Sequence, residues 1–354
     1  MSSVAPSRHP RSKAGNQARG PVASRISVVI VAVAASLWAS DVFFRTSLIQ
    51  QGLSSSRIVF AEDLLITCAF LPLVPRIISR ARGAARKSWL AMAFIAIGPQ
   101  ALATVLFTQS LNIAFKSGVA NETYLLQQTQ PLIALALAWL VLRERRRRLF
   151  WPLAAIGLIA VYMVIFAQDP ARPWIDLGRG NLTAGLLALG AALLWASGTV
   201  LGRYVVRDIP FAIVTWLRFA LALPVLLVLV VITDGPAGVV SYHLANFVPL
   251  LGLALLPGAV AILLYYHALR STPASIATVA ETAYPLVVTL LLALPHPYGF
   301  AQHVYLLQLL ASGLFILVIV ALNVRVGGLV QVIPALSLSD GSDSDPARVA
   351  SPSA

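Results

Sequence analysis

Ten separate stretches of the chain are long and apolar enough to cross a lipid bilayer, and this limits the fold more than any other feature. A helix that crosses the roughly 30 Å hydrocarbon layer needs about 20 mostly apolar residues. The whole chain is 58% hydrophobic and 11% charged, whereas a soluble domain carries about 25% charged residues. The sequence therefore predicts an all-α integral membrane protein with ten transmembrane helices. The predicted segments are 27–48, 57–78, 89–112, 118–142, 149–166, 182–202, 210–233, 246–269, 273–294 and 304–323.

The basic residues between these segments predict the orientation of the chain, because cytoplasmic loops are rich in Lys and Arg. With the N-terminus in the cytoplasm, the extracytoplasmic loops hold only Arg57, Lys116, Arg172 and Arg179. Almost every other basic loop residue then faces the cytoplasm. We therefore expect both termini in the cytoplasm and a multi-pass protein of the cytoplasmic membrane. The net charge of +13 reflects this topology and does not indicate nucleic-acid binding, which needs basic residues on one solvated face.

A sequence repeat divides the chain into two halves. The letters LWAS at 37–40 recur at 194–197, and AFKS at 114–117 resembles ALRS at 268–271. Five segments per half is an odd number, so the second half enters the membrane from the opposite side. Two inverted five-helix repeats are a transporter architecture, with the substrate site near the midplane between them. The predicted parts are a disordered basic cytoplasmic tail (1–25), the first repeat (26–167), an extracytoplasmic linker (168–181), the second repeat (182–323) and a disordered cytoplasmic tail (324–354).

Several motifs recur in both halves. Trp38 and Trp195 each begin a WAS triplet, and residues 114–144 (AFKSGVANETYLLQQTQPLIALALAWLVLRE) have a counterpart in residues 265–294. These motifs resemble the drug/metabolite transporter superfamily, EamA type, in which a Trp precedes a small residue and Ser or Gly in the first span. The resemblance covers residues 27–323. It implies secondary transport, often export of amino acids, drugs or other metabolites.

The chain departs from the family pattern in two places. The family often opens the second helix of a repeat with Arg-Phe, which matches Arg218-Phe219 here, but Glu62-Asp63 occupies the equivalent position of the first half. The Gly of a Gly-Glu loop is Arg143 in this chain.

Ionisable residues lie inside the predicted segments, where one charge at a helix centre costs about 2.5–3.5 kcal/mol. These charges must therefore face one another or a wet cavity. Asp41 and Arg45 are spaced i,i+4 and share a helix face, and Arg45 could also bridge to Glu62 or Asp63. The ionisable residues inside the predicted segments are Asp41, Arg45, Glu62, Asp63, Arg218 and Glu281, and Glu122 lies nearer a segment end.

Depth along the segments divides these residues into two groups. Asp41, Arg45, Glu62, Asp63 and Glu122 form an outer group, in which one base cannot neutralise four acids. Crowded carboxylates disfavour one another's charged form, so a proton-coupled step is our hypothesis, with Asp41, Glu62 and Asp63 as candidates. The alternative is a set of structural ion pairs that hold the helices together.

The second group lies toward the cytoplasm. We expect Arg218 and Glu281 to pair or to couple through water, in either a structural or a functional role. Tyr266 and His267 approach the same side from the eighth segment.

Neutral residues complete the predicted pathway. Asn121 and Gln128 share a helix face and could line a cavity, or could form interhelical hydrogen bonds worth about 0.6 kcal/mol each. Pro131 and Pro285 are predicted to kink their helices and act as hinges. The predicted gates or cavity walls are Trp38 and Trp195.

These features favour a secondary transporter that moves a small metabolite, an amino acid or similar, by alternating access, with export as the expected direction. The alternatives are a membrane-embedded enzyme and a channel-like protein without carrier activity. An enzyme is not favoured, because the sequence holds neither an Asp-rich metal motif nor a His-Glu-x-x-His motif. The sequence also holds no Walker A motif, which argues against direct coupling to ATP hydrolysis. No cofactor or metal is expected. The partners expected are the substrate, the lipid bilayer and, by hypothesis, protons; substrate identity and oligomeric state do not follow from the sequence.

Overall fold

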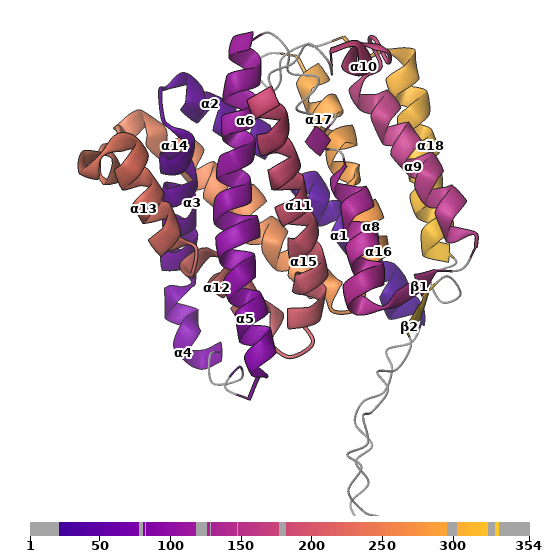
Figure 1. Cartoon of the computed structure of the whole chain (residues 1–354), viewed down its shortest axis with the longest axis horizontal. Coiled ribbons are helices and arrows are strands. Elements are labelled where there is room, and N and C mark those ends of the chain that lie inside the picture. The colour runs from indigo at the N-terminus through magenta and orange to yellow at the C-terminus, as the bar shows by residue number, and fades with distance from the viewer. Residues whose placement is uncertain are drawn as a thin grey trace, which may run out of the picture.

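The computed structural model describes residues 21–77, 81, 83–117, 126–127, 129–146, 148–176, 182–295, 303–324 and 330–332. Over this part of the chain nearly every element is a helix (Figure 1). Those before residue 180 are α1 (Pro21–Trp38), α2 (Asp41–Gln50), α3 (Ser55–Phe70), η1 (Leu71–Leu73), α4 (Val74–Ile77), α5 (Arg86–Ile95), η3 (Ala96–Leu102), α6 (Ala103–Ser117), α8 (Gln130–Leu142), α9 (Phe150–Ile165) and α10 (Arg172–Asp176). Those after it are α11 (Leu182–Val205), α12 (Phe211–Ala220), α13 (Leu223–Asp234), η4 (Pro236–Val239), α14 (Leu244–Leu253), η5 (Ala254–Val260), α15 (Ala261–Leu269), α16 (Ala274–Glu281), α17 (Ala283–Ala293) and α18 (Leu306–Val324).

Six helical stretches among the described residues are long and apolar enough to cross a membrane. They are Ile26–Gln50, Arg86–Ile113, Leu182–Val205, Phe211–Asp234, Leu244–Leu269 and Ala274–Leu291. Shorter apolar helices cover Gln130–Leu142, Phe150–Ile165 and Leu306–Val318. The chain is thus a multi-pass helical membrane protein, while ten spans and two cytoplasmic termini stay predictions.

The first LWAS copy coincides with a break in the helix, and the second does not. α1 ends at Trp38 and α2 begins at Asp41, after a turn at Ala39 and Ser40. Asp41 therefore lies in the first turn of α2, where the helix dipole favours an acid. The second copy lies inside the continuous helix α11. The repeated letters thus occur in two different local structures.

Two π-helical segments interrupt the two longest helical stretches, one in each half. η3 contains Pro99 and η5 contains Pro257, each as the fourth of seven residues. A proline inside a helix removes one backbone hydrogen bond and clashes with the preceding turn, and a local π-helical turn is one way to accommodate it. π-helical turns are frequent at functional sites.

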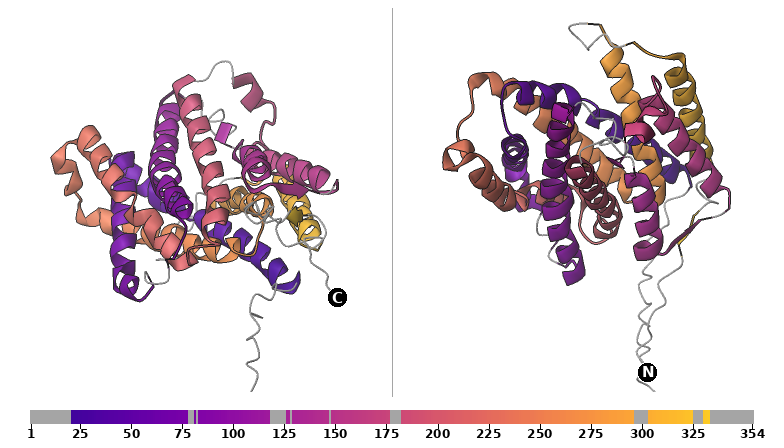
Figure 2. Two further views of the ribbon diagram at one scale, coloured as in Figure 1. Left: turned by 60° about the horizontal axis from the view of Figure 1, so that its bottom comes forward. Right: turned by 45° about the horizontal axis from the view of Figure 1, so that its top comes forward.

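The two predicted halves pack against each other reciprocally. α1 lies against α15, α16 and α17, while α11 lies against α5, η3, α6 and α8. α3 packs on α12 and α13, and α9 packs on α18. Figure 2 shows α6 (purple) beside α11 (crimson) in both views. Related segments therefore exchange partners between the halves.

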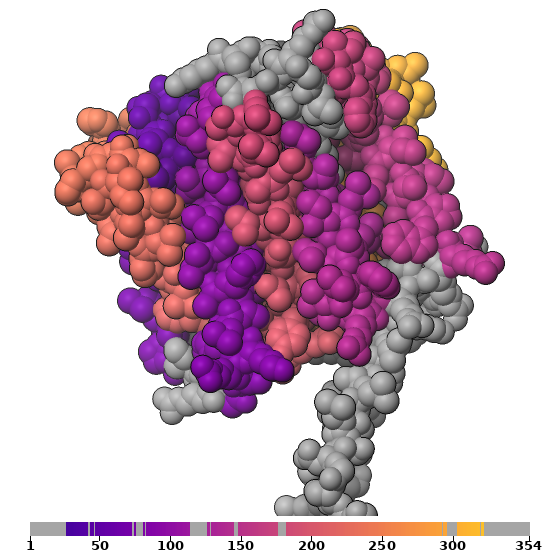
Figure 3. Space-filling model, viewed as in Figure 1, coloured from indigo at the N-terminus to yellow at the C-terminus, as the bar shows by residue number. Residues whose placement is uncertain are grey.

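The main apolar core lies where α1, α12, α15 and α16 meet. Val31, Ile213, Tyr266 and Ala277 are each at most 1% exposed there. On the face shown in Figure 3, α6, α11 and the pair α8 and α9 follow one another across the surface. Many large apolar side chains on the outer faces are exposed, including Leu140, Ile159 and Ile232. This suits a helix bundle that is surrounded by lipid.

A small sheet ties the segment after α18 to the loop after α8. Strands β1 (Glu144–Arg146) and β2 (Val330–Val332) pair antiparallel, with Arg145 opposite Gln331. They lie at the opposite end of the bundle from α10 (Figure 1). Residues 330–332 belong to the segment 324–354, and the assignment of that segment to a disordered cytoplasmic tail stays a prediction.

Candidate functional site

The guanidinium of Arg45 contacts two acids, Asp41 and Glu62. Its Nε and Nη2 atoms donate to the two carboxylate oxygens of Asp41 at 2.7 and 2.6 Å. Nη2 also donates to Oε2 of Glu62 at 3.1 Å, which joins α2 to α3. The three side chains are only 8–26% exposed. Both predicted contacts of Arg45 are therefore confirmed.

A second chain of hydrogen bonds begins at the neighbouring residue, Asp63. Oδ1 of Asp63 accepts from Nε2 of Gln100 at 2.9 Å, and Oε1 of Gln100 accepts from Nε of Arg218 at 2.5 Å. Nη1 of Arg218 donates to the hydroxyl of Tyr266 at 3.0 Å. Asp63 is 0% exposed and Gln100 is 6% exposed. These contacts join α3, η3, α12 and α15 into one polar network.

Gln100 links Asp63 of the expected outer group to Arg218 of the expected inner group, and the depth of the two groups in the membrane stays a prediction. Arg218 and Glu281 form no direct ion pair among the described residues, and their coupling through water stays a prediction. Glu281 instead accepts from the hydroxyl of Tyr265 at 2.7 Å and from Oγ1 of Thr199 at 3.3 Å. Depth along a helix does not give the rotation of its side chains, so neutral acceptors reach Arg218 and neutral donors reach Glu281.

The predicted aromatic residues take different places. Trp38 packs on Tyr265, with 5.3 Å between ring centroids, and so borders the network. Trp195 packs on Phe107 at 5.2 Å and contacts the other half through α6. His267 packs edge-on against Phe211 at 4.9 Å. Tyr266 thus meets Arg218 as expected, whereas the imidazole of His267 packs on α12.

The polar residues predicted before Pro131 fall mostly outside the described part of the chain. Asn121, Glu122 and Gln128 all lie outside the described residues. Pro131 stands in the first turn of α8. Pro285 follows the break at Thr282 by three residues and has no N–H for the carbonyl of Glu281. Pro131 thus lies at the start of one helix and Pro285 just after the turn between α16 and α17, and the role of both as hinges stays a prediction.

The two π-helical segments lie on either side of the acids of α3. Gln100 belongs to η3, and Gly258 of η5 faces α3 from the other half. A Cβ atom at position 258 would lie 2.5 Å from Cδ1 of Ile66 and 3.4 Å from Oε1 of Glu62. Sequence reasoning missed both residues, although a proline inside each apolar run gave a signal.

Glu144 fixes the start of the helix that carries Glu281. Its carboxylate accepts from the backbone N–H groups of Ala274 and Ser275 at 3.0 and 3.4 Å, and from the Ser275 hydroxyl at 2.8 Å. Glu144 is 1% exposed. An acid at a helix N-terminus satisfies free N–H groups and suits the helix dipole. The carboxylate therefore links the loop after α8 to α16 in the other half.

Removing this carboxylate is expected to destabilise the protein. Glu144→Ala leaves buried donors of Ala274 and Ser275 unpaired, which costs about 1–3 kcal/mol. The unfolding temperature of the purified protein should fall accordingly. The matched control is Asp169→Ala, because Asp169 accepts from the N–H groups of Ala171 and Arg172 at 3.1 and 3.2 Å but is exposed. Equal losses in both variants would contradict the role given to Glu144.

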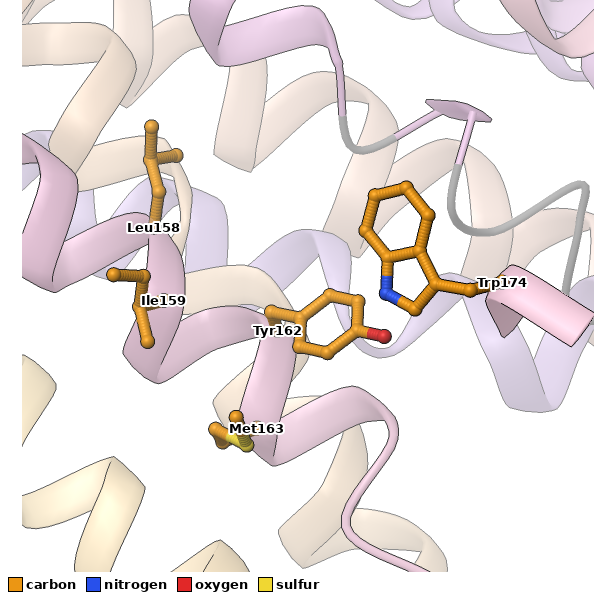
Figure 4. Close-up of a pocket in the computed structure, with 5 residues that line it drawn as sticks. All are labelled: Leu158, Ile159, Tyr162, Met163 and Trp174. Carbon is orange, nitrogen blue, oxygen red and sulfur yellow. The ribbon is translucent and has the colours of Figure 1, made fainter. Parts of the chain in front are cut away.

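One further hollow lies on the outer side of α9, away from the network. Leu158, Ile159, Tyr162, Met163 and Trp174 line about 330 Å³ of mostly apolar space (Figure 4). None of the predicted site residues lines it. Among the described residues, no group of three or more His, Cys, Asp or Glu side chains is placed to hold a metal ion.

Comparison with known proteins identifies one family whose model matches both halves of the chain. The model of the EamA-like transporter family matches residues 25–166 and again residues 182–324. A protein named riboflavin transporter ImpX, from Fusobacterium nucleatum, is 30% identical over 164 residues, which are 46% of this chain and 54% of that protein. The chain thus aligns with about half the length of this curated relative. A solved structure described as "Crystal structure of protein" has a TM-score of 0.63 at 19% identity, over 85% of this chain and 96% of that one, and so shares the fold.

Proposed function

This chain belongs to the EamA-like transporter family, and we propose that it exports a small metabolite across the cytoplasmic membrane by alternating access. Two hydrogen-bonded groups carry this proposal: Asp41, Arg45 and Glu62 form one, and Asp63, Gln100, Arg218 and Tyr266 form the other. They meet at the adjacent residues Glu62 and Asp63 of α3. Together they join elements of both matched repeats, and transporters of repeated design place their substrate sites between the repeats. The proposed architecture is ten spans in two inverted five-helix repeats. The reciprocal packing of α1 and α11 supports it.

The substrate class follows from the charges of the network. Acids and arginines lie side by side, so a solute with both an amino and a carboxylate group could bind to each. An amino acid or a similar metabolite is the proposed substrate. Riboflavin belongs in the same screen, because one relative is named a riboflavin transporter. Purified protein in lipid vesicles is the assay, with amino acids, amines, sugars and riboflavin as solutes. Saturable flux of one of them supports a carrier, and no flux of any of them would refute the proposal.

Proton coupling is the second part of this proposal. Asp41→Asn and Glu62→Gln each remove an acid that contacts Arg45, and each is expected to weaken the dependence of transport on a pH gradient. A lost coupling free energy of about 1–3 kcal/mol corresponds to a 5- to 150-fold smaller effect of the gradient. Asp169→Asn, which changes an exposed acid, is the control. If both network variants kept the full gradient dependence, these acids would have no part in coupling.

A further inference from the structure

Asp63 differs from the other acids of the network in how its charge is matched. Both oxygens of Asp41 and one oxygen of Glu62 accept from the guanidinium of Arg45. Asp63 accepts only from the neutral amide of Gln100, at Oδ1. Its other oxygen, Oδ2, is buried and has no hydrogen-bond partner among the described residues. A fully buried carboxylate with one bare oxygen is costly in its ionised form.

The charged neighbours of Asp63 do not supply the missing partner. Glu62 is adjacent on α3, and Arg45 of α2 is committed to Asp41 and Glu62. Arg218 of α12 reaches Asp63 only through Gln100.

The other elements packed on α3 add no charge near Asp63. η1, η5 and α14 contain no acidic or basic residue. α13 brings Asp234 to Ser54 and Ser56 at the start of α3, and α6 contacts the same end through Asn112. In this conformation the balance of contacts therefore favours a proton on Asp63.

The amide of Gln100 decides which oxygen can carry that proton. A guanidinium only donates, so the carbonyl oxygen of Gln100 must face Arg218 and its NH₂ group must face Asp63. This orientation follows from the hydrogen-bond partners of the two amide atoms. Oδ1 of Asp63 therefore faces a donor and has to accept. A proton on Oδ1 would clash with the N–H of Gln100, whereas Oδ2 has no hydrogen-bond partner among the described residues.

We propose that Asp63 is the proton-binding residue of this network, that Oδ2 carries the proton, and that Gln100 is the residue that positions it. This inference rests on the proposed proton coupling, for which the sequence gives Asp41, Glu62 and Asp63 as candidates. Gln100 acts through Asp63, because its hydrogen bond stabilises the ionised form and keeps Oδ1 as an acceptor. Arg218 in turn fixes the amide of Gln100.

The test measures protonation directly by acid-induced infrared difference spectra of the purified full-length protein. A carboxylic-acid C=O band should appear on acidification, and its Asp63 component should be absent in Asp63→Asn. Gln100→Met removes a hydrogen bond to the ionised carboxylate, worth about 1.5–3 kcal/mol. The pH midpoint of the band should therefore rise by about one to two units.

The matched control is Gln308→Met. Gln308 is partly buried and bonds only backbone groups, accepting from the N–H of Tyr305 at 2.9 Å and donating to the carbonyl of Val164 at 3.0 Å. Its midpoint should stay at the wild-type value. A midpoint unchanged in Gln100→Met, or a full band in Asp63→Asn, overturns the inference; the second measurement does not require Gln100→Met to fold. A protein that shows the Asp63 band but moves no solute refutes the proposed function and supports this assignment.

Discussion

Arg45→Met is expected to lower the free energy of unfolding by about 3 kcal/mol or more, because it leaves the buried Glu62 and the partly buried Asp41 without their counter-ion. Arg45 supplies three hydrogen bonds to Asp41 and Glu62 and ties α2 to α3. The loss should appear as a lower unfolding temperature and a smaller yield of monodisperse protein in detergent. Transport should fall as well, since the broken helix at Ser40 loses its fixed contact to α3.

A compensating variant distinguishes two causes of the lost stability, the unpaired charges and the lost packing of the Arg45 side chain. Arg45→Met combined with Asp41→Asn and Glu62→Gln removes the unpaired charges, so it should recover much of the unfolding temperature. Replacing a complete ion pair by neutral groups is often nearly neutral for stability. Arg86→Met, at an exposed position on α5, is the control for loss of an arginine. If the triple variant is no more stable than Arg45→Met, the cost is one of packing.

Among Gly→Ala substitutions in α11, Gly198→Ala is expected to lower the stability of the protein most. A Cβ atom at position 198 would lie 2.8 Å from Cβ and 2.9 Å from Cγ of Pro99. A proline ring has no rotamer that could move it aside, so α11 and η3 must separate. Overpacking of this kind costs about 1–3 kcal/mol. Because η3 also carries Gln100, the variant should reduce transport in vesicles along with stability.

The same helix offers a control for this prediction. A Cβ atom at position 190 would meet its nearest neighbour, Cδ1 of Leu106, at 3.5 Å, which is an ordinary contact. Gly190→Ala should therefore be at least as stable as the wild type, with a gain of at most about 1 kcal/mol from better helix propensity. Similar behaviour of the two variants would show that α11 and η3 can move apart without cost.

The local part of the site could be predicted from the sequence. Asp41 and Arg45 are four residues apart, so a helix brings them together whatever the rest of the fold does. Glu62 lies at a similar depth on the next segment, and Arg45 is long enough to reach it. Spacing and depth were sufficient for these contacts, because each depends on one helix or on two consecutive ones.

The long-range part of the site could not be predicted in this way. Gln100 is a neutral residue in an apolar run, and its role depends on a π-helical turn that rotates it between Asp63 and Arg218. Glu281 was matched to Arg218 by charge, but Tyr265 and Thr199 are closer in the fold. These contacts depend on the rotation of four helices from both halves, which helix length and hydropathy do not determine.

The loop after α8 contains one of the two departures of this chain from the family pattern. Arg143, which replaces the family's Gly, has a left-handed backbone with φ 52° at the end of α8. Glycine adopts this conformation freely, whereas other residues pay roughly 1–2 kcal/mol. The turn directs the following residue, Glu144, to the start of α16. The loop that contains Arg143 and Glu144 thus connects the two halves, and the sequence pattern alone did not indicate this connection.

The two halves carry opposite charges at equivalent positions, Glu62 in one and Arg218 in the other, and each lies beside the π-helical segment of the other half. Two copies of the first half would place an acid at both positions, and two copies of the second would place an arginine at both. Either protein would bury like charges together. The halves are therefore no longer interchangeable, and these positions could diverge only after two distinct copies existed, either in one gene or in two. An ancestor built from two identical subunits is expected to have held uncharged side chains there.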